Sequence, residues 1–510
     1  MQKTTNNLFS KQLNRLRKSL LLSAYLLTST LFLNAQGIEP HYIKADDAIA
    51  NQQFGHEVSI SGDFMAVSSS NMGLYSVNGI DVNAVYIYKK TAEGHWSQIQ
   101  KIDGPFNSFN SGGFGYSISM SEDRLAIGCI YYNDVGQDGK TGLVYIYKKD
   151  EEDQWSLQQT LAPFLDQEGD MFGISVDLNG DDLAIGSRMS IYFYTLENDS
   201  FLWKTGVNGF TWDYFLGHTV KISGDYMATL QYDFISNDYD VLVFSSSEDE
   251  GYQLEGTIEG LNGGFMKEIA SGVVPSISLN EKELVISSFY DNTEAIYVYE
   301  RDDEANWMFK QQIVPEIEDG ELDWIGGSVV LTDKYLVTPG GFTNWNQQQE
   351  WALWVYEKND DNLWTQKTSL YSGPDCEKWC TGWTLDMDED ALAMGSIWDS
   401  RDGDFAGQAY VLDLGYFTNI MTPQEAFGEL NQNSPNPFTD ETIISFELEE
   451  AAVAEIRITD LNGKLVRSLK QDFAKGLNSV TIRDINTSGI LYYTLVVGDF
   501  ATTKKMVIVE

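Results

Sequence analysis

Residues 54–67 read Phe54-Gly55-His56-Glu57-Val58-Ser59-Ile60-Ser61-Gly62-Asp63-Phe64-Met65-Ala66-Val67. Apolar residues alternate with polar ones up to Gly62-Asp63, and an apolar run follows, which predicts two short strands joined by a tight turn. The same pattern returns along the chain, with equivalent apolar residues at Met65, Leu125, Leu183, Met227, Leu284, Leu336 and Leu392. A pattern that recurs at this spacing indicates a repeat architecture.

Each copy continues with a variable loop and two further strand patterns. The third pattern is an apolar run with tyrosine or tryptophan, as in Val85-Tyr86-Ile87-Tyr88, Val144-Tyr145-Ile146-Tyr147, Ile296-Tyr297-Val298-Tyr299 and Leu353-Trp354-Val355-Tyr356. The fourth begins with an aromatic residue, namely Trp96, Trp155, Phe201, Tyr252, Trp307 and Trp364. One such unit could not bury its apolar faces alone. Four strands in each of seven units therefore predict an all-β chain built on a seven-bladed β-propeller.

The repeat resembles the FG-GAP family. Phe54-Gly55, Phe114-Gly115 and Phe172-Gly173 match the opening of that repeat, and Leu216-Gly217 and Ile325-Gly326 match it loosely. The resemblance spans roughly residues 40–414, and we expect the propeller domain to occupy residues 36–415. Because this repeat serves many extracellular proteins, the resemblance implies a fold and leaves the ligand open.

The seventh copy has no aromatic-headed fourth strand. Residues 38–44 precede Phe54-Gly55 in the way that a fourth strand precedes the next copy. We therefore expect the two ends of the propeller to share one blade. Pro40 fits this position because the fourth strand is an outer edge strand.

The first 35 residues have the features of a secretory signal peptide. Residues 1–18 carry basic side chains and no acid, an apolar run extends from Leu20 to Leu33, and Asn34-Ala35-Gln36 follows. This order predicts cleavage between Ala35 and Gln36. The run is short for a membrane span, so we expect no transmembrane segment after cleavage.

The C-terminal part differs from the repeats. After a linker at 416–429, alternating segments separated by turns predict a small antiparallel β-sandwich over 430–510. This segment resembles the type A C-terminal sorting domain of the type IX secretion system of Bacteroidetes. The matching elements are Pro435-Asn436-Pro437-Phe438, Asp460-Leu461-Asn462-Gly463-Lys464, Gly476-Leu477-Asn478, Ser488-Gly489 with Tyr492, and Lys504-Lys505. The resemblance implies passage through the periplasm, contact with the type IX secretion machinery, and release or attachment at the outer cell surface.

The charge of the chain restricts its partners. The chain has 76 acidic and 33 basic residues, for a formal net charge of -43. Such a surface repels phosphate backbones and anionic lipid, which argues against nucleic acid and against membrane docking. Cationic ligands, neutral ligands and ligands bridged by a divalent ion stay open.

Cysteine and metal chemistry are sparse. Cys129 lies in a strand pattern and is expected to be a buried apolar residue. Cys376 and Cys380 have no second pair or nearby His to complete a metal site, and a local disulfide and two separate thiols are equally open. The acidic stretches Asp177–Asp182 and Asp386–Asp390 lie at tight turns, whereas calcium requires six to eight oxygen ligands. We therefore expect no cofactor, with calcium the only one that these turns leave open.

No motif of nucleophilic, zinc or phosphate chemistry is present in the sequence. His56 and His218 occupy one repeat position, where we expect them to pack. The sequence favours a secreted or surface-displayed, non-enzymatic binding protein for adhesion to a glycan or protein. The alternatives are a polysaccharide lyase or hydrolase using a carboxylate pair, and a structural surface component.

Tryptophans that break the repeat suggest where a ligand would bind. They are Trp212, Trp324 and Trp379, which precede first strands, and Trp345 and Trp398, which follow second strands. Loops of these two kinds emerge on the same face of a propeller. Acids such as Asp323 and Asp399 stand beside them, and flat aromatic rings next to hydrogen-bonding groups suit a sugar ring. The alternative hypothesis is that these tryptophans only pack the loops onto the propeller.

Overall fold

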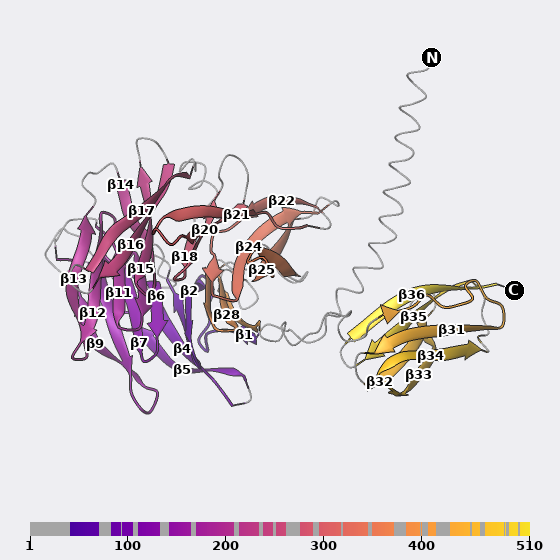
Figure 1. Cartoon of the computed structure of the whole chain (residues 1–510). Coiled ribbons are helices and arrows are strands. Elements are labelled where there is room, and N and C mark those ends of the chain that lie inside the picture. Colours follow the sequence, from indigo (N-terminus) through magenta and orange to yellow (C-terminus); the bar gives the residue numbers. More distant parts are fainter. Residues whose placement is uncertain are drawn as a thin grey trace, which may run out of the picture. The chain divides into compact units, whose positions relative to one another are not determined.

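A computed structural model of the chain shows two compact units, one of Glu39–Asp413 and one that contains Leu414–Glu510 (Figure 1). The described residues are 41–70, 83–92, 94–105, 111–132, 142–164, 170–208, 214–233, 238–247, 251–261, 276–288, 295–317, 320–344, 349–371, 384–397, 399, 406–414, 429–448, 451–459, 465–483, 485, 489–497 and 500–509. Across these ranges the regular secondary structure consists of β-strands, and there is no helix.

The first unit is a series of antiparallel sheets, each built from strands that follow one another in the chain. The first sheet contains β2 (Phe54–Ser61), β3 (Phe64–Ser69), β4 (Ala84–Lys90) and β5 (Trp96–Asp103). The second contains β6 (Ser111–Ser121), β7 (Arg124–Tyr132), β8 (Leu143–Lys149) and β9 (Trp155–Leu161). The third contains β10 (Ser175–Asn179), β11 (Asp182–Gly186), β12 (Ser190–Glu197) and β13 (Ser200–Asn208). The fourth contains β14 (Tyr214–Ser223), β15 (Tyr226–Asp233), β16 (Asp238–Ser247) and β17 (Gly251–Leu261).

Three further sheets complete the described part of this unit. The fifth contains β18 (Ser276–Leu279), β19 (Glu283–Ser288), β20 (Ala295–Arg301) and β21 (Trp307–Ile313). The sixth contains β22 (Glu321–Ile325), β23 (Val330–Leu331), β24 (Tyr335–Thr343), β25 (Gln349–Lys358) and β26 (Trp364–Tyr371). The seventh contains β27 (Thr384–Asp388), β28 (Ala391–Ser396), β29 (Gln408–Asp413) and β1 (His41–Ile43). The four-strand path of each sheet is that of a propeller blade, so the predicted all-β propeller fold is confirmed.

Tight turns join the first strand of each repeat to the second as the sequence predicts, and in the sixth sheet this turn lies between β23 and β24. Ser61 pairs with Phe64 across Gly62-Asp63, and Ser223 pairs with Tyr226 across the equivalent turn. The second strands are mostly apolar because neighbouring sheets cover both of their faces. β3 illustrates this, since every residue in it is buried, including Ser68 and Ser69.

The seventh sheet closes the unit by combining both ends of it. β1 pairs antiparallel with β29, with Tyr42 opposite Tyr410. The prediction that an N-terminal strand completes the last repeat is therefore confirmed. The seventh sheet in turn contacts the first. Asp386 Oδ2 of the seventh sheet accepts hydrogen bonds from Ser59 Oγ and the Ile60 N–H of the first sheet, each over 2.8 Å. Figure 1 shows β28 beside β2, so the series of sheets returns to its start.

The aromatic residues that head the fourth strands pack between neighbouring sheets. Trp155 lies against Phe64 of the preceding sheet with ring centroids 6.1 Å apart, and Trp307 lies against Tyr226 at 6.2 Å. These residues belong to the cores that join consecutive sheets. Their burial explains why the fourth strand of each repeat can be recognised from a single aromatic residue.

The second unit is a two-sheet sandwich around one apolar core. One sheet contains β30 (Glu429–Leu430), β31 (Glu441–Leu448) and β34 (Gly476–Arg483). The other contains β33 (Leu465–Phe473), β32 (Ala452–Thr459), β35 (Gly489–Val497) and β36 (Phe500–Ile508). Alternation is strict in β31, whose Thr442, Ile444 and Phe446 point into the protein while Ile443 is exposed. The predicted small antiparallel sandwich is confirmed.

Candidate functional site

The first strands of the propeller sheets surround a central cavity. They contact one another in a closed cycle that runs β2, β6, β10, β14, β18, β23, β27 and back to β2. The cavity has a volume of about 910 Å³, which is within the range of small-molecule binding sites. Each of these strands contributes residues to its lining, and β23 contributes Leu331 but not Val330. We define this cavity as the central channel.

The first inward position of each strand carries a hydroxyl side chain in all copies but one. The residues are Glu57, Ser117, Ser175, Thr219, Ser276, Ser328 and Thr384. Where the residue is serine it can tie one sheet to the next, since Ser117 Oγ donates to the Gly173 carbonyl over 2.8 Å and Ser175 Oγ donates to the Gly217 carbonyl over 2.7 Å. Glu57 replaces this hydroxyl with a carboxyl group.

The second inward position also has a structural role. Its residues in the strands that line the channel are Ser59, Ser119, Asp177, Lys221, Ser278 and Asp386. Five of these side chains accept a main-chain N–H of the next sheet, from Met120, Leu178, Ile222, Leu331 and Ile60 respectively, over 2.6 to 3.0 Å. Lys221 cannot accept such a bond, because an ammonium group has no acceptor.

Glu57 lies half-buried in the wall of the channel, where Thr384 Oγ1 donates to its Oε2 over 2.8 Å. Burial raises the pKa of the Glu57 carboxyl to about 7, and the nearby Asp386 charge adds to the increase while Lys221 opposes it. Burial also raises the pKa of Asp386. Near neutral pH the Glu57 carboxyl can therefore either donate or accept a hydrogen bond.

Lys221 is one of two lysines that line the channel, the other being Lys282. The Nζ of Lys221 lies 3.4 Å from Asp177 Oδ1, and 36% of its side-chain surface is accessible. The charge of Asp177 is the main cause that raises the pKa of Lys221, and Asp386 and Glu57 act in the same direction. The ammonium therefore stays charged and keeps N–H groups available to the channel.

His56 and His218 both line the channel, at the equivalent position of their two repeats. Burial lowers the pKa of His56 to about 4 and also lowers that of His218, so both rings are neutral at physiological pH. His56 packs against Tyr116 with ring centroids 5.3 Å apart. The expected packing role is visible in this contact, although the rings also face the cavity.

Two tryptophans of the sixth sheet line the same cavity. Trp324 in β22 and Trp351 in β25 both lie opposite Gly341 of β24, and their ring centroids are 5.4 Å apart. A Cβ at Gly341 would lie 2.5 Å from Trp324 Nε1, so the absence of a side chain there permits the two rings to meet. Trp324 is half-buried and gives the polar channel an aromatic surface, while Trp351 is 7% exposed and packs against it.

The structure places only part of the predicted ligand site. Trp324 lines the channel, whereas Trp212, Trp345, Trp379 and Trp398 lie outside the described residues, as do Cys376 and Cys380. Asp323 is exposed and accepts a hydrogen bond from Thr343. Asp399 is 1% exposed and accepts a hydrogen bond from Tyr410 over 2.7 Å, so burial removes it from the expected polar rim.

Sequence reasoning missed Glu57, Lys221 and Trp351. A comparison of inward positions across the copies would have identified the first two, because Glu57 interrupts a row of hydroxyl residues and Lys221 interrupts a row of hydrogen-bond acceptors. Trp351 stands at the start of a strand in an otherwise apolar run, and no pattern in the sequence distinguishes it from a core residue.

The acidic turns show how their carboxylates are used. Asp177 Oδ2 accepts the Ile222 N–H over 2.6 Å, and Asp388 Oδ2 accepts the Gly62 N–H over 2.5 Å. In the described part of the chain, no group of three or more His, Cys, Asp or Glu side chains is arranged to hold a metal ion.

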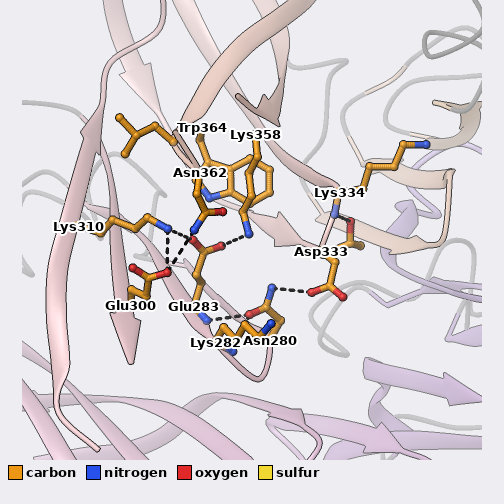
Figure 2. A network of polar contacts seen from close by, with 12 residues as sticks. Asn280, Lys282, Glu283, Glu300, Lys310, Asp333, Lys334, Lys358, Asn362 and Trp364 are labelled. Carbon is orange, nitrogen blue, oxygen red and sulfur yellow. Dashed lines mark hydrogen bonds and ion pairs between the residues drawn. The ribbon is translucent and has the colours of Figure 1, made fainter. Parts of the chain in front are cut away.

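A second polar network lies between the fifth and sixth sheets (Figure 2). Glu283, 1% exposed, pairs with Lys310 Nζ at 2.7 Å and with Lys358 Nζ at 2.9 Å. Asn280 Nδ2 donates to Asp333 over 3.3 Å at the edge of the channel. The buried charge of Glu283 is balanced by Lys310 of the fifth sheet and Lys358 of the sixth, so this group of three side chains serves packing between the two blades.

The sorting motif is part of the second unit's fold. Asn436 Oδ1 accepts the Val507 N–H over 2.8 Å, and Phe438 is buried in the sandwich core. The Pro435 carbonyl accepts a hydrogen bond from Thr442 Oγ1 over 2.8 Å. Gly489 has a φ of 106°, a conformation that favours glycine. Gly463 lies outside the described residues. Pro437 directly precedes Phe438 in the motif.

Comparison with known protein families gives one match in each of the two units. The family described as "FG-GAP repeat" matches residues 41–88, and the "Secretion system C-terminal sorting domain" matches residues 434–509. No curated protein matches the chain. Within the described residues no helix could span a membrane.

Two solved structures share a distant likeness. The periplasmic gluconolactonase of Pseudomonas aeruginosa is 12% identical with a TM-score of 0.40, over 62% of this chain and 85% of its own. A Bacteroides ovatus protein described as "Xyloglucan PUL GH43B" is 11% identical with a TM-score of 0.29, over 90% of both chains. The two family matches show that the chain combines an FG-GAP-repeat β-propeller with a type IX secretion sorting domain, and that it is exported to the cell surface or the extracellular space.

Proposed function

We propose that this exported protein is a non-enzymatic carbohydrate-binding protein, and that its ligand enters the central channel beside Trp324 and Trp351. The observation that carries the proposal is one cavity that offers both an aromatic surface and rows of hydroxyl and carboxyl side chains. A sugar ring has apolar faces and a polar rim, so it can use both kinds of contact at once. Adhesion to glycan at the cell surface is the biological role that such binding would serve.

Several sequence predictions belong to the same proposal. The signal peptide with cleavage after Ala35, the propeller domain at 36–415, the linker at 416–429 and the sorting domain at 430–510 describe how the binding unit is delivered. Trp212, Trp345, Trp379 and Trp398 stay predicted ligand contacts.

The test is binding of the exported protein to an array of neutral and acidic glycans, followed by calorimetry on the best ligand. Trp324→Ala should weaken binding at least tenfold, because it removes one ring of the aromatic surface. Trp203→Ala is the matched control, since Trp203 lies on β13, is 49% exposed and does not line the channel. Binding to no glycan, or equal losses in both variants, would contradict the proposal and favour a protein ligand or a structural role.

A polysaccharide-acting hydrolase is the second candidate. The observation that favours it is Glu57, whose carboxyl has a pKa of about 7 and lies near the second carboxyl group of Asp386. A carboxyl group that is protonated near neutral pH can act as a general acid. Incubation with the same glycans and detection of new reducing or unsaturated ends distinguishes this candidate from a binding protein.

A further inference from the structure

Glu57 and Lys221 are the two channel residues that depart from the repeat and give up a structural hydrogen bond. At the Glu57 position, Ser117 and Ser175 each donate to a main-chain carbonyl of the next sheet. At the Lys221 position, Ser119 and Ser278 each accept a main-chain N–H of the next sheet. The repeat thus shows that serine serves the fold at both positions, whereas Glu57 and Lys221 contact only a side chain of the preceding sheet, Thr384 and Asp177 respectively.

Glu57 and Lys221 interact electrostatically within one cavity. The charge of Lys221 lowers the pKa of Glu57, and the charge of Glu57 raises that of Lys221. Both residues line the channel, Glu57 from β2 and Lys221 from β14. One therefore provides an oxygen acceptor and the other a set of N–H donors toward the same enclosed space.

We infer that Glu57 and Lys221 are the ligand-holding residues of the central channel, with Lys221 donating to, and Glu57 accepting from, hydroxyl groups of a neutral saccharide. This inference rests on the proposed function and specifies its ligand. A sugar hydroxyl donates and accepts at the same time, so it matches a wall that offers both partners.

The remaining charges of the wall select against acidic sugars. Asp177 lies 3.4 Å from Lys221 Nζ, and Asp386 is close enough to affect the pKa values of both Lys221 and Glu57. A uronate that approached Lys221 would meet these carboxylates, and like charges in an enclosed site repel. The Lys221 ammonium is already balanced by Asp177, which leaves it able to donate hydrogen bonds but not to attract a net negative ligand.

The experiment restores the repeat residue at each position. Glu57→Ser and Lys221→Ser introduce the side chain that other copies carry, so both variants should stay folded and show one cooperative melting transition. Calorimetry with the best neutral oligosaccharide from the array should show a loss of at least tenfold in affinity for each variant. Acidic oligosaccharides should bind the parent protein at least tenfold more weakly than neutral ones.

A matched pair of variants controls for surface charge. Lys204 and Glu197 form an ion pair on β13 and β12, outside the channel, and Lys204→Ser and Glu197→Ser should leave affinity unchanged. If Lys221→Ser loses stability because Asp177 is left without its partner, Lys221→Gln keeps an N–H donor and should retain more affinity than Lys221→Ser.

The outcomes separate this inference from the proposed function. If the parent protein binds a neutral saccharide and both serine variants bind it within twofold, the inference is wrong and the proposed function stands. If the parent protein prefers acidic saccharides, the assignment of a neutral ligand is wrong. If the parent protein binds no saccharide, both are wrong.

Discussion

The side-chain amide of Gln100 in the first sheet forms two hydrogen bonds with the main chain of Trp155 in the second. Its Nε2 donates to the Trp155 carbonyl over 2.7 Å, and the Trp155 N–H donates to its Oε1 over 2.8 Å. The same arrangement joins Gln159 to Phe201 and Gln311 to Trp364. A glutamine in one fourth strand thus fixes the aromatic residue at the head of the next.

Replacement of this glutamine should loosen the contact between the first two blades. In Gln100→Ala, both partly buried main-chain groups of Trp155 lose their partner, at a cost of about 1 to 3 kcal/mol in the free energy of unfolding. Urea denaturation measures the change. Ser97→Ala, at an exposed position of the same strand, should change stability by less than about 0.5 kcal/mol. Equal stability of Gln100→Ala and the parent protein would show that the paired bonds contribute nothing.

The shared seventh blade makes a second prediction. Ile43 of β1 is 3% exposed and packs in the core between the seventh and first sheets. Ile43→Ala should therefore lower the free energy of unfolding by about 2 to 5 kcal/mol. His41→Ala, at an exposed position two residues earlier on the same strand, is the control. A melting temperature of Ile43→Ala equal to that of the control would mean that the N-terminal strand does not close the propeller.

The buried ion cluster between the fifth and sixth sheets makes a third prediction (Figure 2). Glu283→Gln leaves Lys310 and Lys358 beside a neutral side chain that is buried, and breaking a buried charge pair costs about 3 to 5 kcal/mol. Glu300→Gln removes the more exposed partner of Lys310 and should cost less than about 1 kcal/mol. Chemical denaturation of both variants provides the comparison, and a smaller loss in Glu283→Gln than in Glu300→Gln would contradict this account.

The repeat made most of the fold predictable, because strand alternation and tight turns recur in each copy. Closure through residues 41–43 could be predicted from the missing fourth strand of the last copy. The Gln100–Trp155 contact could not, because it depends on the register between two sheets that no local pattern reveals. The site was harder still, since Glu57 and Lys221 occupy ordinary polar positions of a strand and gain meaning only when all inward positions are compared.

Gly341 makes a fourth prediction, about the aromatic surface of the channel. An alanine Cβ at this position would lie 2.5 Å from Trp324 Nε1 and 3.1 Å from a ring carbon of Trp351, so at least one ring must move. Gly341→Ala should weaken carbohydrate binding several-fold, because the two rings can no longer meet over the glycine. Gly256→Ala is the control, since its Cβ would make only an ordinary contact of 3.5 Å with Trp307, outside the channel. Calorimetry that finds equal affinities for the two variants would remove the tryptophan pair from the site.

Glu57 makes the last prediction, on the pH dependence of stability. Burial raises the pKa of its carboxyl from 4.5 to about 7, with Asp386 adding to the increase and Lys221 opposing it. Between these values the folded protein holds a proton that the unfolded chain has released. The contribution of Glu57 to stability therefore falls as the pH rises from about 4.5 to 7.

Glu57→Ser removes this titration while it restores the hydroxyl of the repeat. The variant should gain stability relative to the parent protein as the pH is raised from 5 to 8, by an amount on the order of 1 to 2 kcal/mol after allowance for water in the channel. Urea denaturation of both proteins at the two pH values measures this difference. Glu197→Ser, at an outer strand, should follow the parent protein's pH profile with only a constant offset. If the Glu57→Ser profile runs parallel to that of the parent protein as well, then the Glu57 carboxyl titrates in the folded protein as it does in the unfolded chain, and burial in the channel does not govern its proton.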